Sequence, residues 1–322
     1  MAPRILVTAN PLSSLEIMRE LAPAGFDITV ATPGSPEFAA ALTGAEYVVG
    51  LGEVKMDDAF YRAAPKLRLI QLLSAGYDRV DIEAARRAGV PVCNNGGANS
   101  VAVSEHAMLL MLAVCRRLTW LHGNVVAGRW RGNDVANVRL YELHGRTLGI
   151  VGLGTIGKKT ARLARAFGMA VQYYDIARLT EDQADALGVR FRLLGELLRT
   201  SDIVTLHVPL TPRTKHMIGA AELKLMQKTA YLINTSRGPV IDETALHAAL
   251  TDGTIAGAGL DVFDQEPPAA DNPLFRLDNV ILTPHYAGPT WDNQYSRFRN
   301  AFDNVQRVAR GEAPLWVIPE LR

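Results

Sequence analysis

The chain has 322 residues, 48% of them hydrophobic and 21% charged, and its formal net charge is +1. This length favours two domains, and the composition is typical of a globular protein. The balanced charge makes nucleic acid an unexpected partner. No apolar run reaches membrane-spanning length and the amino-terminal residues lead directly into a strand pattern, so we expect no membrane contact and a cytoplasmic location.

The two cysteines, Cys93 and Cys115, lie in apolar surroundings. Neither has a second cysteine or a histidine at metal-ligand spacing, so we expect buried thiols in a reducing compartment and no metal site.

The first part of the chain alternates short apolar runs with helical patterns, which predicts a parallel sheet. The predicted strands are 4–9, 27–31, 45–51, 67–74 and 90–94, and the helices between them are 14–25, 57–65 and 81–89.

The pattern changes in the turn-rich segment NNGGANS (94–100), where we place a domain boundary. Residues 100–128 follow as one long helical pattern that is apolar on most faces and must be buried on several sides. A second α/β series comes next. Its predicted strands are 147–154, 170–175, 202–208, 230–236, 255–263 and 280–285, and its predicted helices are 155–168, 242–253 and a final one at 291–311.

A G-x-G-x-x-G motif joins the first strand and helix of this second series. Its glycines are Gly152, Gly154 and Gly157, and Asp175 ends the next strand 18 residues after Gly157. This is the fingerprint of a dinucleotide site, in which the turn and the helix N-terminus receive the pyrophosphate. The charge of Asp175 would repel a 2′-phosphate, so NAD is favoured over NADP, although Arg178 could weaken that preference.

Three chemically active side chains follow strands of this second sheet. Arg237, Glu266 and His285 come just after the predicted carboxyl ends of three strands, where parallel sheets bind ligands. Histidine suits a general acid near neutral pH, a carboxylate can orient it, and an arginine can hold a substrate carboxylate. Each residue alone is also compatible with a structural role. Together they favour hydride chemistry on a 2-keto acid.

The chain resembles the D-isomer-specific 2-hydroxyacid dehydrogenases over nearly its full length. The matching blocks include SAGYDRVDIEAARRAGVPVCN, SEHAMLLMLAVCRR, GRTLGIVGLGTIGKKTARLARAFGM, LINTSRGPVIDETAL, GAGLDVFDQEP and TPHYAG. The resemblance implies two Rossmann-like or flavodoxin-like parallel-sheet domains. The discontinuous substrate domain would comprise 1–98 and 288–322, and the NAD-binding domain 99–287. It also implies a homodimer formed through the long helix and the arm that follows it.

The resemblance assigns Arg237 to substrate binding and Glu266 and His285 to an acid–base pair. Asp261 would hold the nicotinamide carboxamide, and Thr235 would lie near the nicotinamide ribose. The implied substrate contacts are Ser74, Ala75, Gly76, Arg237 and His285. The expected cofactor contacts are Gly152, Gly154, Thr155, Ile156, Gly157, Asp175, His207, Val208, Pro209, Thr235, Asp261, His285 and Gly288.

We therefore expect an NAD-dependent enzyme that interconverts a small 2-keto acid, such as glyoxylate or hydroxypyruvate, and its D-2-hydroxy acid. The alternatives are a short D-3-phosphoglycerate or D-lactate dehydrogenase, an enzyme acting on formate or phosphite, and an NAD(H)-sensing corepressor on the same fold. Three residues depart from the family pattern: Tyr141, Tyr286 and Trp291. They could reshape the pocket around the substrate side group.

Overall fold

The computed structural model describes residues 2–10, 13–50, 54–131 and 138–322. The chain forms two compact units, Met1–Asn99 with Gly288–Arg322 and Ser100–Ala287. Residue 51, the last of the strand predicted at 45–51, lies outside the described residues, and so do residues 132–137 of the arm that follows the long helical pattern.

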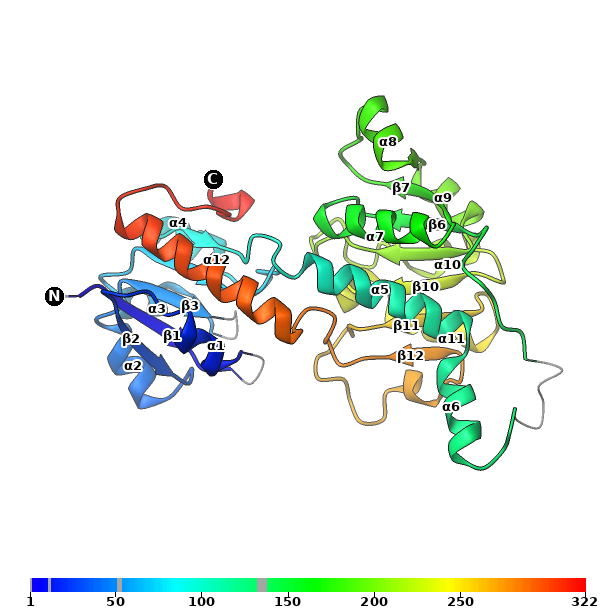
Figure 1. Ribbon diagram of the computed structural model, residues 1–322, viewed down its shortest axis with the longest axis horizontal. Coiled ribbons are helices and arrows are strands. Elements are labelled where there is room, and N and C mark those ends of the chain that lie inside the picture. Colours follow the sequence, from blue (N-terminus) through cyan, green and yellow to red (C-terminus); the bar gives the residue numbers. More distant parts are fainter. Residues whose placement is uncertain (1, 11–12, 51–53, 132–137) are drawn as a thin grey trace. The chain divides into compact units, whose positions relative to one another are not determined.

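The first unit has a five-stranded parallel sheet in the order β2-β1-β3-β4-β5, the flavodoxin-like order. Helices α2, α3 and α4 pack on one face, and α1 and α12 on the other (Figure 1). Ser and Asp side chains cap α1 to α4, and Thr290 caps α12. The elements are β1 (Arg4–Thr8), α1 (Leu15–Glu20), β2 (Asp27–Ala31), α2 (Pro36–Leu42), β3 (Tyr47–Gly50), α3 (Asp58–Ala63), β4 (Leu69–Leu72), α4 (Ile82–Ala88), β5 (Val92–Cys93), α12 (Trp291–Ala309) and the 3-10 turn η3 (Pro319–Leu321).

The second unit has a seven-stranded parallel sheet in the order β12-β11-β10-β9-β6-β7-β8, a Rossmann order with one further strand. Helices α5, α7 and α8 share a core with one face, and α9, α10 and α11 with the other. The elements are α5 (Ser100–Cys115), α6 (Leu118–Val126), β6 (Thr147–Val151), α7 (Thr155–Ala166), β7 (Ala170–Tyr174), α8 (Glu181–Leu187), β8 (Val189–Phe191), α9 (Leu194–Thr200), β9 (Ile203–Leu206), α10 (Ala220–Leu225), β10 (Tyr231–Asn234), η1 (Gly238–Val240), α11 (Glu243–Thr251), β11 (Gly257–Leu260), η2 (Pro273–Arg276) and β12 (Val280–Leu282).

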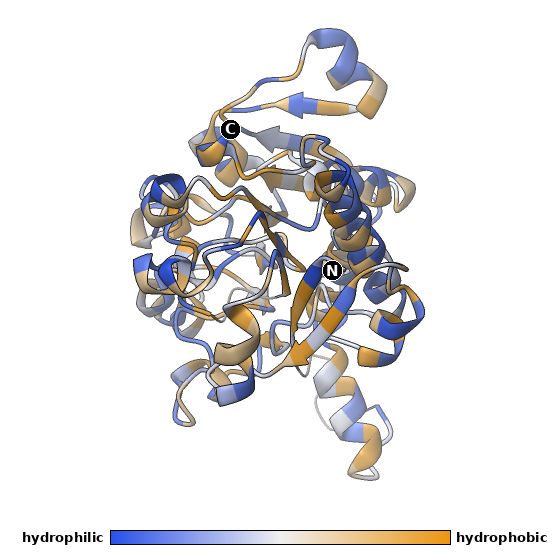
Figure 2. Ribbon diagram, turned by 90° about the vertical axis from the view of Figure 1, so that its left-hand side faces the viewer, coloured by the Kyte–Doolittle hydropathy of each residue, from blue (hydrophilic) through white to orange (hydrophobic). Residues whose placement is uncertain are grey.

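Figure 2 shows the apolar residues concentrated along the strands, with polar residues on the outer parts of many helices. Six of the twelve strands, β3, β4, β5, β9, β10 and β11, are buried at every residue, as expected for strands in parallel sheets covered on both faces. The predicted fold class, two parallel-sheet α/β domains, is confirmed.

One long helix over 100–128 was expected, and this was wrong. The chain breaks between α5 and α6, where Arg117 has a left-handed φ of 48°. The carbonyl of Cys115 at the end of α5 accepts a hydrogen bond from Tyr141 N at 2.9 Å. A segment distant in sequence thus satisfies a helix-end carbonyl, which no local pattern could indicate.

The second unit also contains elements that the sequence pattern did not predict: β8, α8, α9 and α10. Strand β8 has only three residues at the edge of the sheet, too few for a periodic signal. Strand β8 extends one edge of the sheet, and the central strands are as expected.

Candidate functional site

The strands of the second unit end in a common row, and this row positions the site. Strand pairing aligns the last residues of six neighbouring strands: Tyr174, Val151, Leu206, Asn234, Leu260 and Leu282. The next residue on each strand therefore emerges at the same carboxyl edge: Asp175, Gly152, His207, Thr235, Asp261 and Thr283. Five of these six were predicted to contact the cofactor.

The glycine turn has three distinct environments. Gly152 has φ 94°, and a Cβ there would lie 2.8 Å from the carbonyl carbon of His207. A Cβ on Gly157 would lie 2.3 Å from the carbonyl oxygen of Gly152, so α7 packs directly against the turn. A Cβ on Gly154 would meet no atom within 4 Å, which leaves open space in front of the helix N-terminus. The exposed Thr155 begins α7, whose first N–H groups have no acceptor within the helix.

Asp175 supports this turn directly. Its Oδ2 accepts a hydrogen bond from Leu153 N at 2.6 Å, and its Oδ1 accepts one from Ala177 N at 2.9 Å. Each carboxylate oxygen has two acceptor sites, so both retain capacity for ribose hydroxyls. The guanidinium of Arg178 lies 4.0 Å from the centre of the Phe191 ring and is engaged there by a cation–π contact.

Two buried polar atoms at the same edge have no hydrogen-bond partner among the described residues. They are Thr235 Oγ1 and His207 Nδ1. Burial lowers the pKa of His207 to about 4, so its imidazole is neutral at physiological pH. Its Nε2 lies 3.2 Å from Thr205 Oγ1. Leaving buried polar atoms without hydrogen bonds costs free energy unless a ligand supplies the partners. A dinucleotide carries hydroxyl groups and an amide that can form such hydrogen bonds.

Glu266 and His285 form a direct pair. Glu266 Oε2 lies 2.7 Å from His285 Nδ1, and its Oε1 accepts a hydrogen bond from Phe263 N at 3.1 Å. Burial raises the pKa of Glu266, but the hydrogen bond and charge of His285, with smaller effects from Phe263 N and Arg237, more than offset this. The resulting pKa lies below the usual value of 4.5. The imidazole is 47% exposed and, since Nδ1 faces the carboxylate, Nε2 remains for a substrate.

Arg237 lies beyond β10 on a turn organised by one amide side chain. Asn234 Nδ2 donates to the Arg237 carbonyl at 2.9 Å, and Asn234 Oδ1 accepts from Ser236 N and Ser236 Oγ. A Cβ on Gly238 would lie 1.8 Å from the carbonyl oxygen of Phe263, so this turn packs tightly against the segment after β11. Arg237 contributes to the lowered pKa of Glu266, which brings all three predicted catalytic residues into one electrostatic group.

A buried carboxylate fixes the turn that carries His285. Asp261 Oδ1 accepts hydrogen bonds from Thr283 Oγ1 at 2.6 Å and Tyr286 N at 2.9 Å, and Oδ2 accepts one from Ala287 N at 2.9 Å. The Asp261 carbonyl also accepts from His285 N at 2.7 Å. These bonds hold His285 at a left-handed φ of 57°, which costs a residue with a Cβ about 1–2 kcal/mol.

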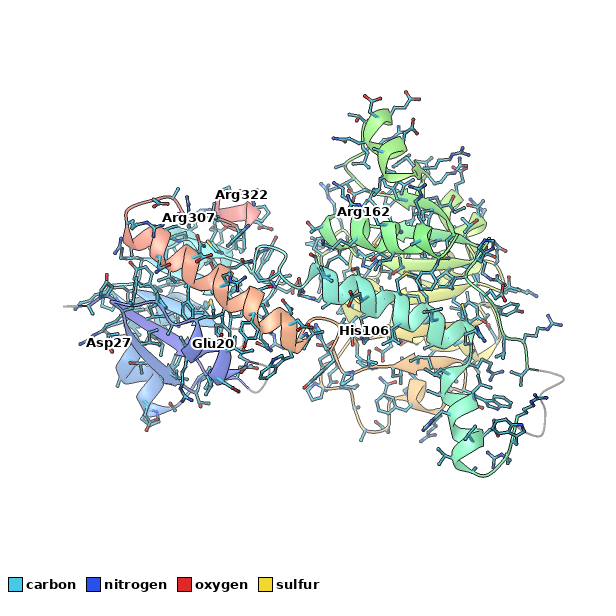
Figure 3. The ribbon with its side chains drawn as sticks, in the orientation of Figure 1. Glu20, Asp27, His106, Arg162, Arg307 and Arg322 are labelled. Atoms are coloured by element: carbon cyan, nitrogen blue, oxygen red, sulfur yellow. The ribbon has the colours of Figure 1, made fainter. Side chains whose placement is uncertain are left out.

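His106 lies on α5 (Figure 3) and extends this network. Its Nε2 lies 2.9 Å from Thr283 Oγ1 and 3.5 Å from Asp261 Oδ1. The link between His106 and the turn of His285 was not predicted from the sequence. No local sequence pattern indicates this contact, because it joins α5 to a residue 177 positions later in the chain.

The expected substrate loop lies in the first unit, directly after β4. Its four successive carbonyls, from Leu73 to Gly76, all accept hydrogen bonds, from Arg297 Nε, Asn95 N, Asn94 Nδ2 and Ser74 Oγ respectively. The N–H groups of Ser74, Ala75, Gly76 and Tyr77 donate to no other described residue. A loop with satisfied carbonyls and available donors is suited to an anion.

The three departures from the family pattern have different environments. Tyr141 packs edge-on against Tyr231, at the amino end of β10, and lies under the guanidinium of Arg146. Within its unit, Tyr141 therefore lies at the opposite edge of the sheet from His285. Tyr286 is 52% exposed and directly follows His285, whereas Trp291, 59% exposed, begins α12 in the other unit.

The described residues contain no group of three or more His, Cys, Asp or Glu side chains placed to hold a metal ion. None of their helices has the length and apolar character needed to cross a membrane.

Comparison with known proteins assigns the chain to a family. Residues 108–287, more than half of the chain, match the model of the D-isomer specific 2-hydroxyacid dehydrogenase, NAD binding domain. The chain belongs to the D-isomer-specific 2-hydroxyacid dehydrogenases. The predictions of an oxidoreductase, of NAD(H) as cofactor and of 2-keto acid reduction are thereby confirmed.

Individual relatives cover most of the chain. A glyoxylate reductase of Korarchaeum cryptofilum is 44% identical over 80% of this chain and 78% of its own length. A D-3-phosphoglycerate dehydrogenase of Methanocaldococcus jannaschii is 38% identical over 96% of this chain and 58% of its own. The structure of a D-lactate dehydrogenase from Aquifex aeolicus with NAD and lactic acid superposes with a TM-score of 0.81, 30% identity and 96% coverage of both chains.

The glycine turn yields a matched pair of variants. Gly157→Ala should lower the free energy of unfolding by about 1–3 kcal/mol, because the new methyl group collides with the carbonyl of Gly152. Gly154→Ala meets no protein atom, so its stability should remain near wild type while its NADH affinity falls. Chemical denaturation and NADH fluorescence titration measure both quantities. Wild-type NADH affinity in Gly154→Ala would contradict a pyrophosphate site at this turn.

The Glu266–His285 pair predicts a pKa change. In the wild type the pKa of Glu266 is lower in the folded protein than in the unfolded chain, so the ionised carboxylate stabilises the folded state. This stabilisation is fully present above the unfolded-state pKa, and it is lost as the pH falls through the folded-state pKa, which lies below 4.5. In His285→Ala the raising effect of burial remains while the largest lowering effects are removed, so the Glu266 pKa should rise. Carbon-13 NMR titration of the Glu266 carboxyl measures this, with His247→Ala as control. An unchanged midpoint in His285→Ala would refute the pairing.

Proposed function

We propose that the protein reduces a small 2-keto acid, of the glyoxylate or hydroxypyruvate type, to its D-2-hydroxy acid with NADH, and catalyses the reverse reaction. The main observation in support is the Glu266–His285 pair. It leaves the second imidazole nitrogen of His285 available at the sheet edge where the predicted cofactor residues lie. The glyoxylate reductases among its relatives, at 40–44% identity, support this substrate class. The alternative substrates, D-3-phosphoglycerate and D-lactate, are those of the more distant relatives.

The residues of the second unit suit a dinucleotide. The glycine turn with Thr155 and Ile156 would receive the pyrophosphate, and Asp175 the adenosine ribose. Val208 and Pro209 would border the adenine, with His207 beside them. The buried Thr235 hydroxyl would be completed by the nicotinamide ribose. The bound nicotinamide supplies or accepts the hydride. Asp261 is already engaged with the turn of His285, so an additional carboxamide contact would use the remaining lone pair of Oδ2.

The chain's own residues would move the proton and hold the substrate. In the reducing direction His285 Nε2 gives a proton to the carbonyl oxygen, and Glu266 holds Nδ1–H and stabilises the protonated ring. Arg237 binds the substrate carboxylate and polarises the adjacent carbonyl. In oxidation His285 takes the hydroxyl proton instead, while Arg237 and Glu266 keep their roles.

The two units would divide these tasks. The unit Ser100–Ala287, with the matched NAD-binding segment, would carry the cofactor, and the unit that contains Ser74, Ala75 and Gly76 would receive the substrate carboxylate. Gly288 is the first residue of the segment with which the chain returns to the first unit. We place the protein in the cytoplasm, as proposed for an enzyme of this chemistry with two buried free thiols.

A homodimer is part of the proposal. Apolar side chains are exposed on α5, α6 and the segment after them, namely Val101, Leu109, Leu118, Val125, Val126, Trp130 and Leu140. Trp130 is 79% exposed and Val126 73%. Such a group of large apolar side chains within one region is typical of a surface that a partner covers, and a second copy of the chain is the proposed partner.

The proton-transfer role is tested with purified enzyme. His285→Ala should lower kcat by about 100-fold or more, the size of a lost general acid, while NADH still binds. The measurement is NADH oxidation against 2-keto acids of increasing side-chain size, with a parallel NADH titration. Wild-type turnover in His285→Ala would exclude the role. Equal or better kinetics with NADPH in the wild type would contradict the proposed effect of Asp175.

The dimer is tested by charge insertion. Val126→Asp should shift the molar mass measured by light scattering from two chains toward one, because an unpaired carboxylate would be buried at the interface. Leu193→Asp is the control, since Leu193 is 67% exposed at the N-cap of α9, where aspartate is well tolerated. An unchanged dimer in Val126→Asp would remove α6 from the interface.

A further inference from the structure

Arg297 is an arginine buried inside the first unit. It lies on α12, is 6% exposed, and donates from Nε to the Leu73 carbonyl at 2.6 Å. No carboxylate in the described part of the chain forms an ion pair with it, and Leu73 is its single hydrogen-bond partner there. Burial lowers the pKa of Arg297 to about 10, so the group still carries its charge at neutral pH.

A buried charge without a counter-ion is costly. The penalty for taking such a group out of water amounts to several kcal/mol, and an apolar residue of similar volume is often as stable or more so. The neighbours of Arg297 on the buried side of α12 include Phe298, Ala301 and Phe302, so an apolar side chain would extend an existing core. Stability alone therefore does not explain an arginine at this position.

Arg297 contacts the start of the loop Ser74–Gly76. Its bond to Leu73 is the first of the four that occupy the loop carbonyls in succession. With its carbonyls engaged, the loop presents N–H donors that have no acceptor among the described residues. A guanidinium bonded to the backbone immediately before these donors adds positive potential to them.

We propose that Arg297 is a positioning residue for the substrate carboxylate. It fixes the Leu73 carbonyl so that the following N–H groups can bind the anion, and the bound carboxylate supplies the negative charge that Arg297 lacks in the free protein. This inference rests on the proposed function, in which the loop receives the carboxylate of a 2-keto acid. It makes Arg297, besides Arg237, a cationic determinant of carboxylate affinity.

The test replaces the charge with a flexible apolar side chain. Arg297→Met should raise the KM for the 2-keto acid by about tenfold or more, and the Ki of oxalate, a carboxylate that cannot be reduced, should rise in parallel. The Kd of NADH should stay at the wild-type value. Resistance to denaturant should be equal or higher, because the buried charge is gone. Arg299→Met is the matched control, since Arg299 lies on the same helix but is exposed.

A lysine variant separates charge from shape. Arg297→Lys keeps the charge but loses the planar fork, so its KM should lie between those of the wild type and Arg297→Met. This variant also decides the matter should Arg297→Met fail to fold. Wild-type KM and oxalate Ki in every folded Arg297 variant would overturn the inference, as would an equal rise in Arg299→Met. Failure of the proposed function is a separate result, in which the wild-type enzyme itself reduces no 2-keto acid.

Discussion

The carboxylate of Asp261 is the constraint on which the rest of the candidate site depends. A fully buried aspartate must be hydrogen-bonded, and this one takes three bonds from the segment Thr283–Ala287. Those bonds force the chain to turn sharply after β12, and the turn presents His285 to Glu266. The cost of the left-handed backbone at His285 is thus met by a network inside the protein, before any substrate binds.

The two units treat buried charge in opposite ways. In the second unit the charge of Asp261 is satisfied by backbone N–H groups, which makes the turn of His285 rigid. In the first unit Arg297 has a carbonyl for a partner and no counter-ion among the described residues. The first arrangement stabilises a fixed geometry in the free protein. In the second arrangement the positive charge of Arg297 is not neutralised until an anionic substrate binds. Its charge therefore contributes to substrate affinity rather than to the stability of the free protein.

Sequence reasoning succeeded where the physical signal is local. Short apolar runs alternating with helices predicted the parallel sheets, and the rule that ligands bind at carboxyl ends of strands brought Arg237, Glu266 and His285 to one edge. It failed where distant segments decide the structure. At the break near Arg117, Tyr141 N donates to the Cys115 carbonyl at the end of α5, and the Tyr141 ring packs against Tyr231, ninety residues further on.

Arg297 shows the same limit within the site. Arg297 and Arg299 stand two residues apart on one helix, and nothing in their local sequence distinguishes a buried arginine from an exposed one. Only the packing of α12 on β4 decides that Arg297 points to the Leu73 carbonyl. Arg297 and its neighbour Phe298 are both buried on α12, and from there the long arginine side chain reaches the Leu73 carbonyl, directly after β4. The arginine brings a charge that a methionine of similar reach would not.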